Sequence, residues 1–373
     1  MKIEGIRLYE FKQSKNLIMP KSFVAIALIF LIAVSLSACK KNNTTITTTE
    51  KNIDYPAAYI VNGESSTISV IKLSTNTVTD SIELVGSGGS MIMWPHHIYH
   101  HQNADMHHMS IGVPGMDLST GHSGGMAGMK GRVMIMDAVK GTLLQNFEVP
   151  LMNHNAVFSP DGSEIWTSQM DMDGKVLVYD AGTYTLKNSI NVGMEPAEVT
   201  FSSDGSKAYV ANGMDNSVSV INSTTKAVVA TVSVGANPVG AWPSAIGKMF
   251  VDNEDGQTIS VIDVASNTNL ATVILNFKPG YAAYNAAINE LWVSDATNGK
   301  VVYYMDMGGD MWMKHGEFAT GADAHAIAFN AAGTIAYVTN QGANTVSVIN
   351  AGTHIKLKDI PVGKKPNGIV LKY

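Results

Sequence analysis

Histidine and methionine, two residue types that bind transition metals, are concentrated in one short part of the chain. Residues 91–136 (MIMWPHHIYHHQNADMHHMSIGVPGMDLSTGHSGGMAGMKGRVMIM) hold seven of the eleven histidines and nine of the 21 methionines. Imidazole is the commonest metal ligand in proteins, and thioether sulfur selects Cu(I). This composition predicts a transition-metal site, with copper favoured and zinc as the alternative. The other interpretation is that these methionines fill an apolar surface, which their flexible side chains do well.

Three histidines also recur at equivalent positions of a long repeat. The seven equivalent positions are His96, His154, Ala197, Val239, Gly280, His325 and Asn367. Their successive spacings are 58, 43, 42, 41, 45 and 42 residues, so the first interval carries an insertion of about 16 residues. The chain therefore contains seven repeat units.

Each unit contains four short runs of alternating β-branched residues, separated by turns with Asn, Asp or Gly. Clear copies begin at residues 208–212 (AYVAN) and 336–340 (AYVTN). Four antiparallel strands repeated every 40-odd residues form a propeller blade, so we predict an all-β, seven-bladed β-propeller. Residues 57–86 supply only three outer strands, and residues 366–373 supply only an innermost strand. One composite blade built from both termini should close the ring.

These repeated sequences resemble the YVTN-type β-propeller repeat, whose Tyr-Val-Thr-Asn strand is intact at residues 337–340. The resemblance covers residues 55–373 and implies a propeller. It says little about activity, because one fold carries many functions. Independently of the resemblance, the Gly-rich segment 112–130, which holds Met116, His122, Met126 and Met129, should be a mobile loop between the second and third strands of blade two.

The innermost strands should all start at one face of the ring, close to the central axis, where propeller ligands usually bind. Three of the seven converging positions are histidine, and the insertion should lie above them. The predicted metal ligands are His96, His154, His325, His97, His122, Met116, Met126 and Met129. The predicted funnel-lining residues are Asn367, Glu195 and Glu198. Each histidine could instead be an ordinary hydrogen-bonding residue of the channel.

Two further resemblances point to copper. The run from His122 to Met129 (HSGGMAGM) resembles the His/Met repeats of periplasmic copper-resistance proteins. The ring of histidines is similar in outline to the propeller of nitrous oxide reductase, which carries a copper cluster. This chain departs from that enzyme, because only three ring positions are histidine and no cupredoxin domain follows. We therefore favour a metal-binding protein without catalytic residues, and leave enzymatic activity open.

Other enzyme classes fit less well. A lactonase-like hydrolase needs clustered carboxylates at the funnel, and only Glu195 and Glu198 stand near it. The sequence contains no G-x-S-x-G, P-loop or CxxCH motif. The alternative to metal binding is a non-catalytic platform that contacts an envelope protein or a glycan.

The N-terminus predicts export and a lipid anchor. Residues 1–38 read as a signal peptide, with a basic head, an apolar run over 23–36 and small residues before Cys39. Leu-Ser-Ala-Cys resembles the lipobox of bacterial lipoproteins, which implies lipidation of Cys39, the only cysteine. Residues 39–54 read as a polar tether. The expected location is the bacterial cell envelope, with the outer membrane or cell surface favoured by Lys40 after the cysteine.

The charge balance excludes one class of partner. The formal net charge is −6, and residues 1–38 account for five basic and two acidic side chains. The remainder holds 20 basic and 29 acidic residues. Such an acidic surface repels phosphate backbones, so nucleic acid is not an expected partner.

Overall fold

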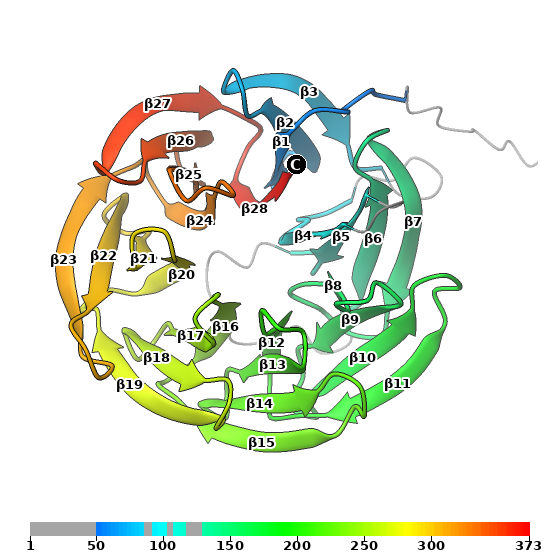
Figure 1. The fold of residues 1–373 in the computed structure, drawn as a ribbon. Coiled ribbons are helices and arrows are strands. Elements are labelled where there is room, and N and C mark those ends of the chain that lie inside the picture. Colours follow the sequence, from blue (N-terminus) through cyan, green and yellow to red (C-terminus); the bar gives the residue numbers. More distant parts are fainter. Residues whose placement is uncertain (1–49, 86–91, 103–106, 117–128) are drawn as a thin grey trace, which may run out of the picture. The chain divides into compact units, whose positions relative to one another are not determined.

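Seven four-stranded antiparallel sheets stand around a central axis in a computed structural model of the chain (Figure 1). The structure describes residues 50–85, 92–102, 107–116 and 129–373. The predicted signal peptide, Cys39 and most of the predicted tether lie outside these residues. No helix in the described part of the chain is long and apolar enough to cross a bilayer. The predicted seven-bladed β-propeller is confirmed.

Blade one is composite, as predicted. It consists of β28 (Pro366–Lys372), β1 (Ala57–Asn62), β2 (Thr67–Lys72) and β3 (Thr77–Glu83). Strand β1 pairs antiparallel with β28, from Ala57 opposite Lys372 to Val61 opposite Gly368. The last strand of the chain thus closes the ring beside the first strand (Figure 1), and no blade in the ring lacks its innermost strand.

The other six blades follow in chain order, each running from the axis outward. Blade two holds β4 (Ile98–Gln102), β5 (His107–Val113), β6 (Gly131–Asp137) and β7 (Thr142–Val149). Blade three holds β8 (Val157–Phe158), β9 (Glu164–Gln169), β10 (Lys175–Asp180) and β11 (Leu186–Asn191). Blade four holds β12 (Pro196–Phe201), β13 (Lys207–Asn212), β14 (Ser217–Asn222) and β15 (Val228–Ser233).

Blade five holds β16 (Pro238–Pro243), β17 (Lys248–Asn253), β18 (Thr258–Asp263) and β19 (Thr268–Ile274). Blade six holds β20 (Pro279–Asn285), β21 (Glu290–Asp295), β22 (Lys300–Asp306) and β23 (Trp312–Ala319). Blade seven holds β24 (Ala324–Phe329), β25 (Ile335–Asn340), β26 (Thr345–Asn350) and β27 (Ile355–Pro361). We name the face at which the innermost strands start the upper face, and the opposite face the lower face.

The hydrophobic core is divided among the spaces between neighbouring blades. One cluster, for example, joins Tyr209 and Val220 of blade four to Met249 and Val251 of blade five. Equivalent clusters join each of the other neighbouring pairs. The middle strands such as β14 are therefore buried on both faces, whereas outermost strands such as β15 are mostly exposed. This arrangement explains why the β-branched runs repeat in every unit.

The asparagine that ends the second strand of four blades has a structural role. Asn212 Nδ2 donates hydrogen bonds to Ser217 Oγ (3.1 Å) and Ser219 Oγ (3.0 Å). The same pair of bonds, to residues five and seven positions later, is made by Asn62, Asn253 and Asn340. The amide thus holds the turn between the second and third strands, which accounts for the Asn of the repeated phrase.

The end of the predicted tether is bonded to the propeller. Lys51 N donates to Lys140 O (2.7 Å), and Ile53 N donates to Val139 O (2.8 Å). The Ile53 side chain is fully buried in the core between blades one and two. Two backbone hydrogen bonds and the burial of one apolar side chain thus hold this segment against blade two.

We expect Asn212→Ala to lower the free energy of unfolding by about 1–3 kcal/mol, because two buried serine hydroxyls lose their partner. Urea unfolding followed by circular dichroism measures this change. Asn188→Ala, on the exposed outermost strand of blade three, is the control and should change little. Equal stability of Asn212→Ala and the wild type would contradict the role given to this amide.

Candidate metal centre

Three histidines meet at the central axis, near the upper ends of blades two and three. His96, His97 and His154 are buried, and each offers a ring nitrogen within 4.8 Å of those of the other two. In the described part of the chain they are the one such group of His, Cys, Asp or Glu that could hold a metal ion. Their ring centroids lie 4.3 Å (His96–His154), 4.4 Å (His96–His97) and 5.1 Å (His97–His154) apart.

The backbone around these histidines explains their close approach. His96 N donates to Gly112 O (2.9 Å), and Gly112 N donates to His97 O (3.3 Å), so both histidines are bonded to the second strand of blade two. A Cβ on Gly112 would lie only 2.5 Å from Cα of Asn155, which follows His154. The absence of a side chain at this glycine lets blade three approach blade two closely.

Glu198, on β12, holds two of the three rings. Its side chain is fully buried, and its Oε1 lies 2.8 Å from His97 Nε2 and 3.0 Å from His154 Nδ1. A carboxylate accepts hydrogen bonds, so these two nitrogens carry hydrogen. In the neutral rings the lone pairs then belong to Nδ1 of His97 and Nε2 of His154. A carboxylate behind a ligating histidine fixes its tautomer and orientation in many metal sites. We refer to His96, His97, His154 and Glu198 as the histidine centre.

The charge of Glu198 depends on its neighbours. Burial opposes ionisation, but the imidazoles of His97 and His154 outweigh it and hold the pKa of Glu198 well below its usual value. The centre therefore contains a buried carboxylate that is ionised beside the two imidazoles.

The second oxygen of Glu198 is also bonded. Tyr99 Oη, from β4, donates to Glu198 Oε2 (3.0 Å) and accepts from Asn155 Nδ2 (3.2 Å). The Asn155 side chain also bonds the backbone of Val199: its Nδ2 donates to Val199 O, and its Oδ1 accepts from Val199 N. Burial first, and then the charge of Glu198, raise the pKa of Tyr99, so this phenol remains protonated. Blades two, three and four are thus linked through one hydrogen-bond network.

Two aromatic rings also lie beside His97. Trp242 and Tyr281, from blades five and six, have ring centroids 3.8 Å apart, and they lie 5.9 Å and 6.1 Å from the His97 ring. Trp242 Nε1 donates to Asp252 (2.7 Å), which also accepts from Gly240 N (3.0 Å). Burial, together with the charges of Glu198 and Glu254, raises the pKa of Asp252 well above its usual value.

The structure brings together part of the predicted ligand set. His96 and His154 meet as expected, and His97 completes the close group. His325 lies beside it, with ring centroids 6.1 Å from His96 and 5.9 Å from His97. Asn367 is buried next to His96 and donates to Pro95 O (3.2 Å).

Glu195 takes a different place from Glu198. It lies in the connection before β12 with a positive φ of 47°, and its carbonyl accepts from Gly213 N.

Of the predicted methionine ligands in the insertion, the described residues include one near each end. Met116 and Met129, both half-buried, pack against the buried side chains of Met152 and Met170 near the upper face of blades two and three. Four thioethers thus form a cluster, and Met152 is two residues from His154 in the sequence. His122 and Met126 lie outside the described residues.

The other histidines of the insert-bearing blade lie at the opposite end of β4. His101 pairs with His108 across β4 and β5, and His100 stacks on His107 with ring centroids 5.7 Å apart. Burial first, and then the charges of His107 and Lys372, lower the pKa of His100 from 6.5 to about 4. These four residues are a separate group from the histidine centre.

The sequence did not lead us to predict three residues that lie around the centre: Tyr99, Trp242 and Tyr281. The innermost strands carry register shifts close to their starts, at Pro196–Val199, Pro238–Gly240, Pro279–Tyr281 and Ala324–Ile327. A bulge sets two residues opposite one and re-aims the side chains that follow. In blades two, four and six the position after the predicted ring residue therefore also lies at the channel, as His97, Glu198 and Tyr281 show. Reading two adjacent positions per blade would have found Tyr281, whereas Tyr99 and Trp242 stand three positions after His96 and Val239.

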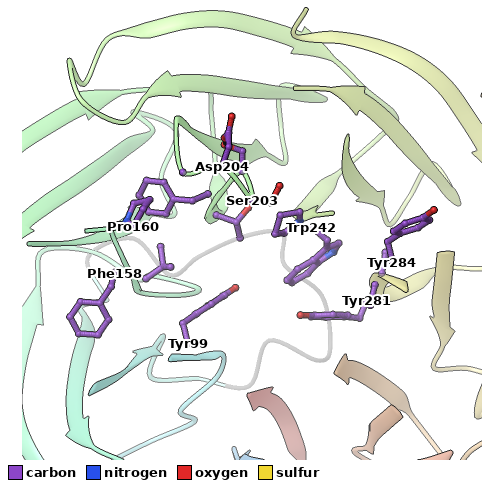
Figure 2. A pocket seen from close by; sticks show the side chains of 16 residues that line it. Tyr99, Phe158, Pro160, Ser203, Asp204, Trp242, Tyr281 and Tyr284 are labelled. Atoms are coloured by element: carbon purple, nitrogen blue, oxygen red, sulfur yellow. The ribbon is translucent and has the colours of Figure 1, made fainter. Parts of the chain in front are cut away.

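A cavity of about 520 Å³ opens at the lower end of the channel. Its wall includes Tyr99, Trp242 and Tyr281, which also lie beside residues of the histidine centre, so the cavity borders that centre (Figure 2). The sequence directed attention to the upper face and gave no indication of this cavity.

A family model described as the choice-of-anchor I domain matches residues 167–366, more than half of the 373-residue chain. The chain belongs to the choice-of-anchor I domain family. The YVTN-type repeat predicted for it is consistent with this family and with its structural neighbours. No curated protein sequence matches this choice-of-anchor chain.

Solved structures similar to this choice-of-anchor protein share its fold. A functionally unknown protein from Desulfotomaculum acetoxidans has a TM-score of 0.67 and 12% identity, covering 85% of this chain and 99% of the other. The periplasmic gluconolactonase of Pseudomonas aeruginosa has a TM-score of 0.65 and 16% identity, covering 85% and 99%. A putative 6-phosphogluconolactonase from Bacteroides fragilis has a TM-score of 0.65 and 15% identity, covering 88% and 99%. At these identities the likeness concerns the fold alone.

The lowered pKa of His100 predicts a specific pH dependence. The unfolded chain takes up this proton near pH 6.5 and the folded chain only near pH 4, so stability falls as the pH decreases through that window. His100→Gln should make the urea midpoint less sensitive to pH between about 4 and 6.5. His315→Gln, on the exposed outermost strand of blade six, is the control. An unchanged slope for His100→Gln would contradict this assignment.

Proposed function

We propose that this chain is a lipid-anchored protein of the bacterial cell envelope that binds a transition metal, with copper favoured, at the histidine centre. The observation that carries the proposal is the close approach of His96, His97 and His154 around the buried carboxylate of Glu198. Envelope location is supported by the choice-of-anchor family and by the periplasmic origin of one structural neighbour. The anchor itself rests on the lipobox at Cys39.

The donor set fits a transition metal. Three imidazoles suit copper, zinc, iron or nickel, and hard cations such as Mg²⁺ and Ca²⁺ prefer oxygen ligands. His97 Nδ1 and His154 Nε2 would be the ligand atoms, because Glu198 occupies the opposite nitrogens. A bound cation would also balance the charge of the buried Glu198 carboxylate. Binding should therefore weaken as the pH falls, since protons and metal compete for the same rings.

Two arguments favour copper over zinc. For a given set of nitrogen ligands, Cu(II) binds more tightly than Zn(II). The thioether cluster of Met116, Met129, Met152 and Met170 is chemically suited to Cu(I) and lies close in sequence to His154. When bound, the metal would be held or passed on. No catalytic residue is assigned.

Metal analysis of tag-free protein from copper-supplemented cells tests this proposal. We expect about one equivalent of metal per chain, with an EPR spectrum of nitrogen-coordinated Cu(II). His96→Asn/His154→Asn should lose it, while the control His315→Asn should retain it. Wild-type protein without stoichiometric copper or zinc would refute the proposal. A partner protein or glycan captured equally well in the presence of chelator would then favour the interaction platform.

A second prediction concerns Glu198. Glu198→Gln cannot accept hydrogen bonds from two imidazoles and a phenol together, so the rings lose their fixed orientation. We expect metal affinity to fall by about 10–100-fold, as for other residues that orient metal ligands. Competition titration with a chromogenic chelator measures the change. Glu195→Gln, three residues earlier in the chain, is the matched control and should bind as the wild type does.

A further inference from the structure

The lower cavity is a candidate binding site that is separate from the histidine centre. It lies where the innermost strands of blades three to six end, and its volume of about 520 Å³ lies in the range of small-molecule sites. Tyr99 lies on one side of it and Trp242 and Tyr281 on the other (Figure 2). A flat molecule can therefore enter between aromatic side chains that come from different blades.

Several polar groups of the wall are already bonded within the protein. Trp242 Nε1 donates to Asp252, and Ser203 Oγ donates to Ser244 O (2.9 Å). Thr200 Oγ1 likewise donates to Ala241 O. A sugar needs many unsatisfied hydrogen-bonding groups from its site, so this wall suits it poorly. The apolar rings that remain favour an uncharged, flat ligand.

Charge gives a second restriction. Among the described residues that line the cavity, none carries a positive charge, and Asp204 adds a carboxylate at the rim. Phosphates and carboxylates would meet repulsion without a compensating partner.

The deep end of the cavity offers one kind of polar contact. The hydroxyls of Tyr99 and Tyr281 point toward one another across the space (Figure 2). The Tyr99 hydrogen is committed to Glu198 Oε2. Burial first, and then the charges of Glu198 and Asp252, raise the pKa of Tyr281, so its hydroxyl remains a donor. The complementary ligand group is an acceptor such as a carbonyl oxygen.

We propose that the lower cavity binds an uncharged, flat aromatic molecule that carries a carbonyl oxygen. Its ring lies between Tyr99 and the Trp242–Tyr281 pair, and its oxygen accepts a hydrogen bond from Tyr281. The site uses no residue of the histidine centre as a ligand contact, so it binds this class of molecule with or without metal.

Coumarin, a neutral bicyclic molecule with one carbonyl, is the probe, and isothermal titration of the full-length protein is the measurement. We expect one site per chain, in both chelator-treated and metal-loaded protein. Tyr281→Phe keeps the ring and removes the donor, so its affinity should fall about 5–10-fold. Tyr284→Phe is the control, because that cavity-lining hydroxyl is directed to Asn289 Oδ1 (3.4 Å) and its loss should change nothing.

Two analogues separate the parts of the proposal. Indene, which has flat fused rings without the carbonyl, should bind wild type and Tyr281→Phe equally and more weakly than coumarin binds wild type. δ-Valerolactone, which has the carbonyl without the aromatic ring, should not bind. The proposal is wrong if coumarin does not bind the folded wild type, or if Tyr281→Phe binds it as tightly. Either result leaves the metal titration unaffected, so the two proposals fail independently.

Discussion

The arrangement at the axis depends on a single buried carboxylate shared by two imidazoles. Glu198 is fully buried, and an isolated ionised carboxylate in such a place would cost several kcal/mol. His97 and His154 remove that cost only if they supply positive charge, either as a proton or around a bound cation. The same carboxylate accepts from Tyr99, so contributions from blades two, three and four must agree in position. Any change in the relative placement of these blades breaks at least one of its hydrogen bonds.

Ring closure provides the rigidity that this agreement needs. Blade two, which carries His96 and His97, lies between blade one and blade three. Asn367 of the last strand bonds Pro95 on one side, and Gly112 admits the backbone of Asn155 on the other. The apolar clusters between neighbouring blades then fix the ring as a whole. The histidine centre is therefore a consequence of tertiary packing between repeats, and no single repeat could form it.

Much of the fold could be predicted from the sequence, because repeat length and strand alternation are local properties. Seven blades and the composite closing blade follow from spacing and from the two incomplete ends. The convergence of His96 and His154 follows from the same spacing. The spacing alone does not place His97 in the group, since a strict alternation allows one inward residue per strand start; His97 was predicted as a ligand from the local concentration of histidine. The register shifts near the strand starts break that alternation, and neither composition nor period reports a bulge. Glu198 was expected only to line the funnel, because its role depends on rings from two other blades.

The channel differs chemically between its upper and lower ends. Near the upper face of blades two and three, four thioethers gather from three separate stretches of the chain. Below the centre, Trp242 and Tyr281 lie beside His97 and form a wall of the lower cavity. The carboxylate and the imidazoles are buried, and in such surroundings their mutual attraction is stronger than at a wet surface. The cation proposed for this site would be held by electrostatics as well as by its ligands. A ligand in the aromatic cavity would exclude water from the side of the centre that faces it. The exclusion of water would therefore affect both sites, although they share no ligand contact.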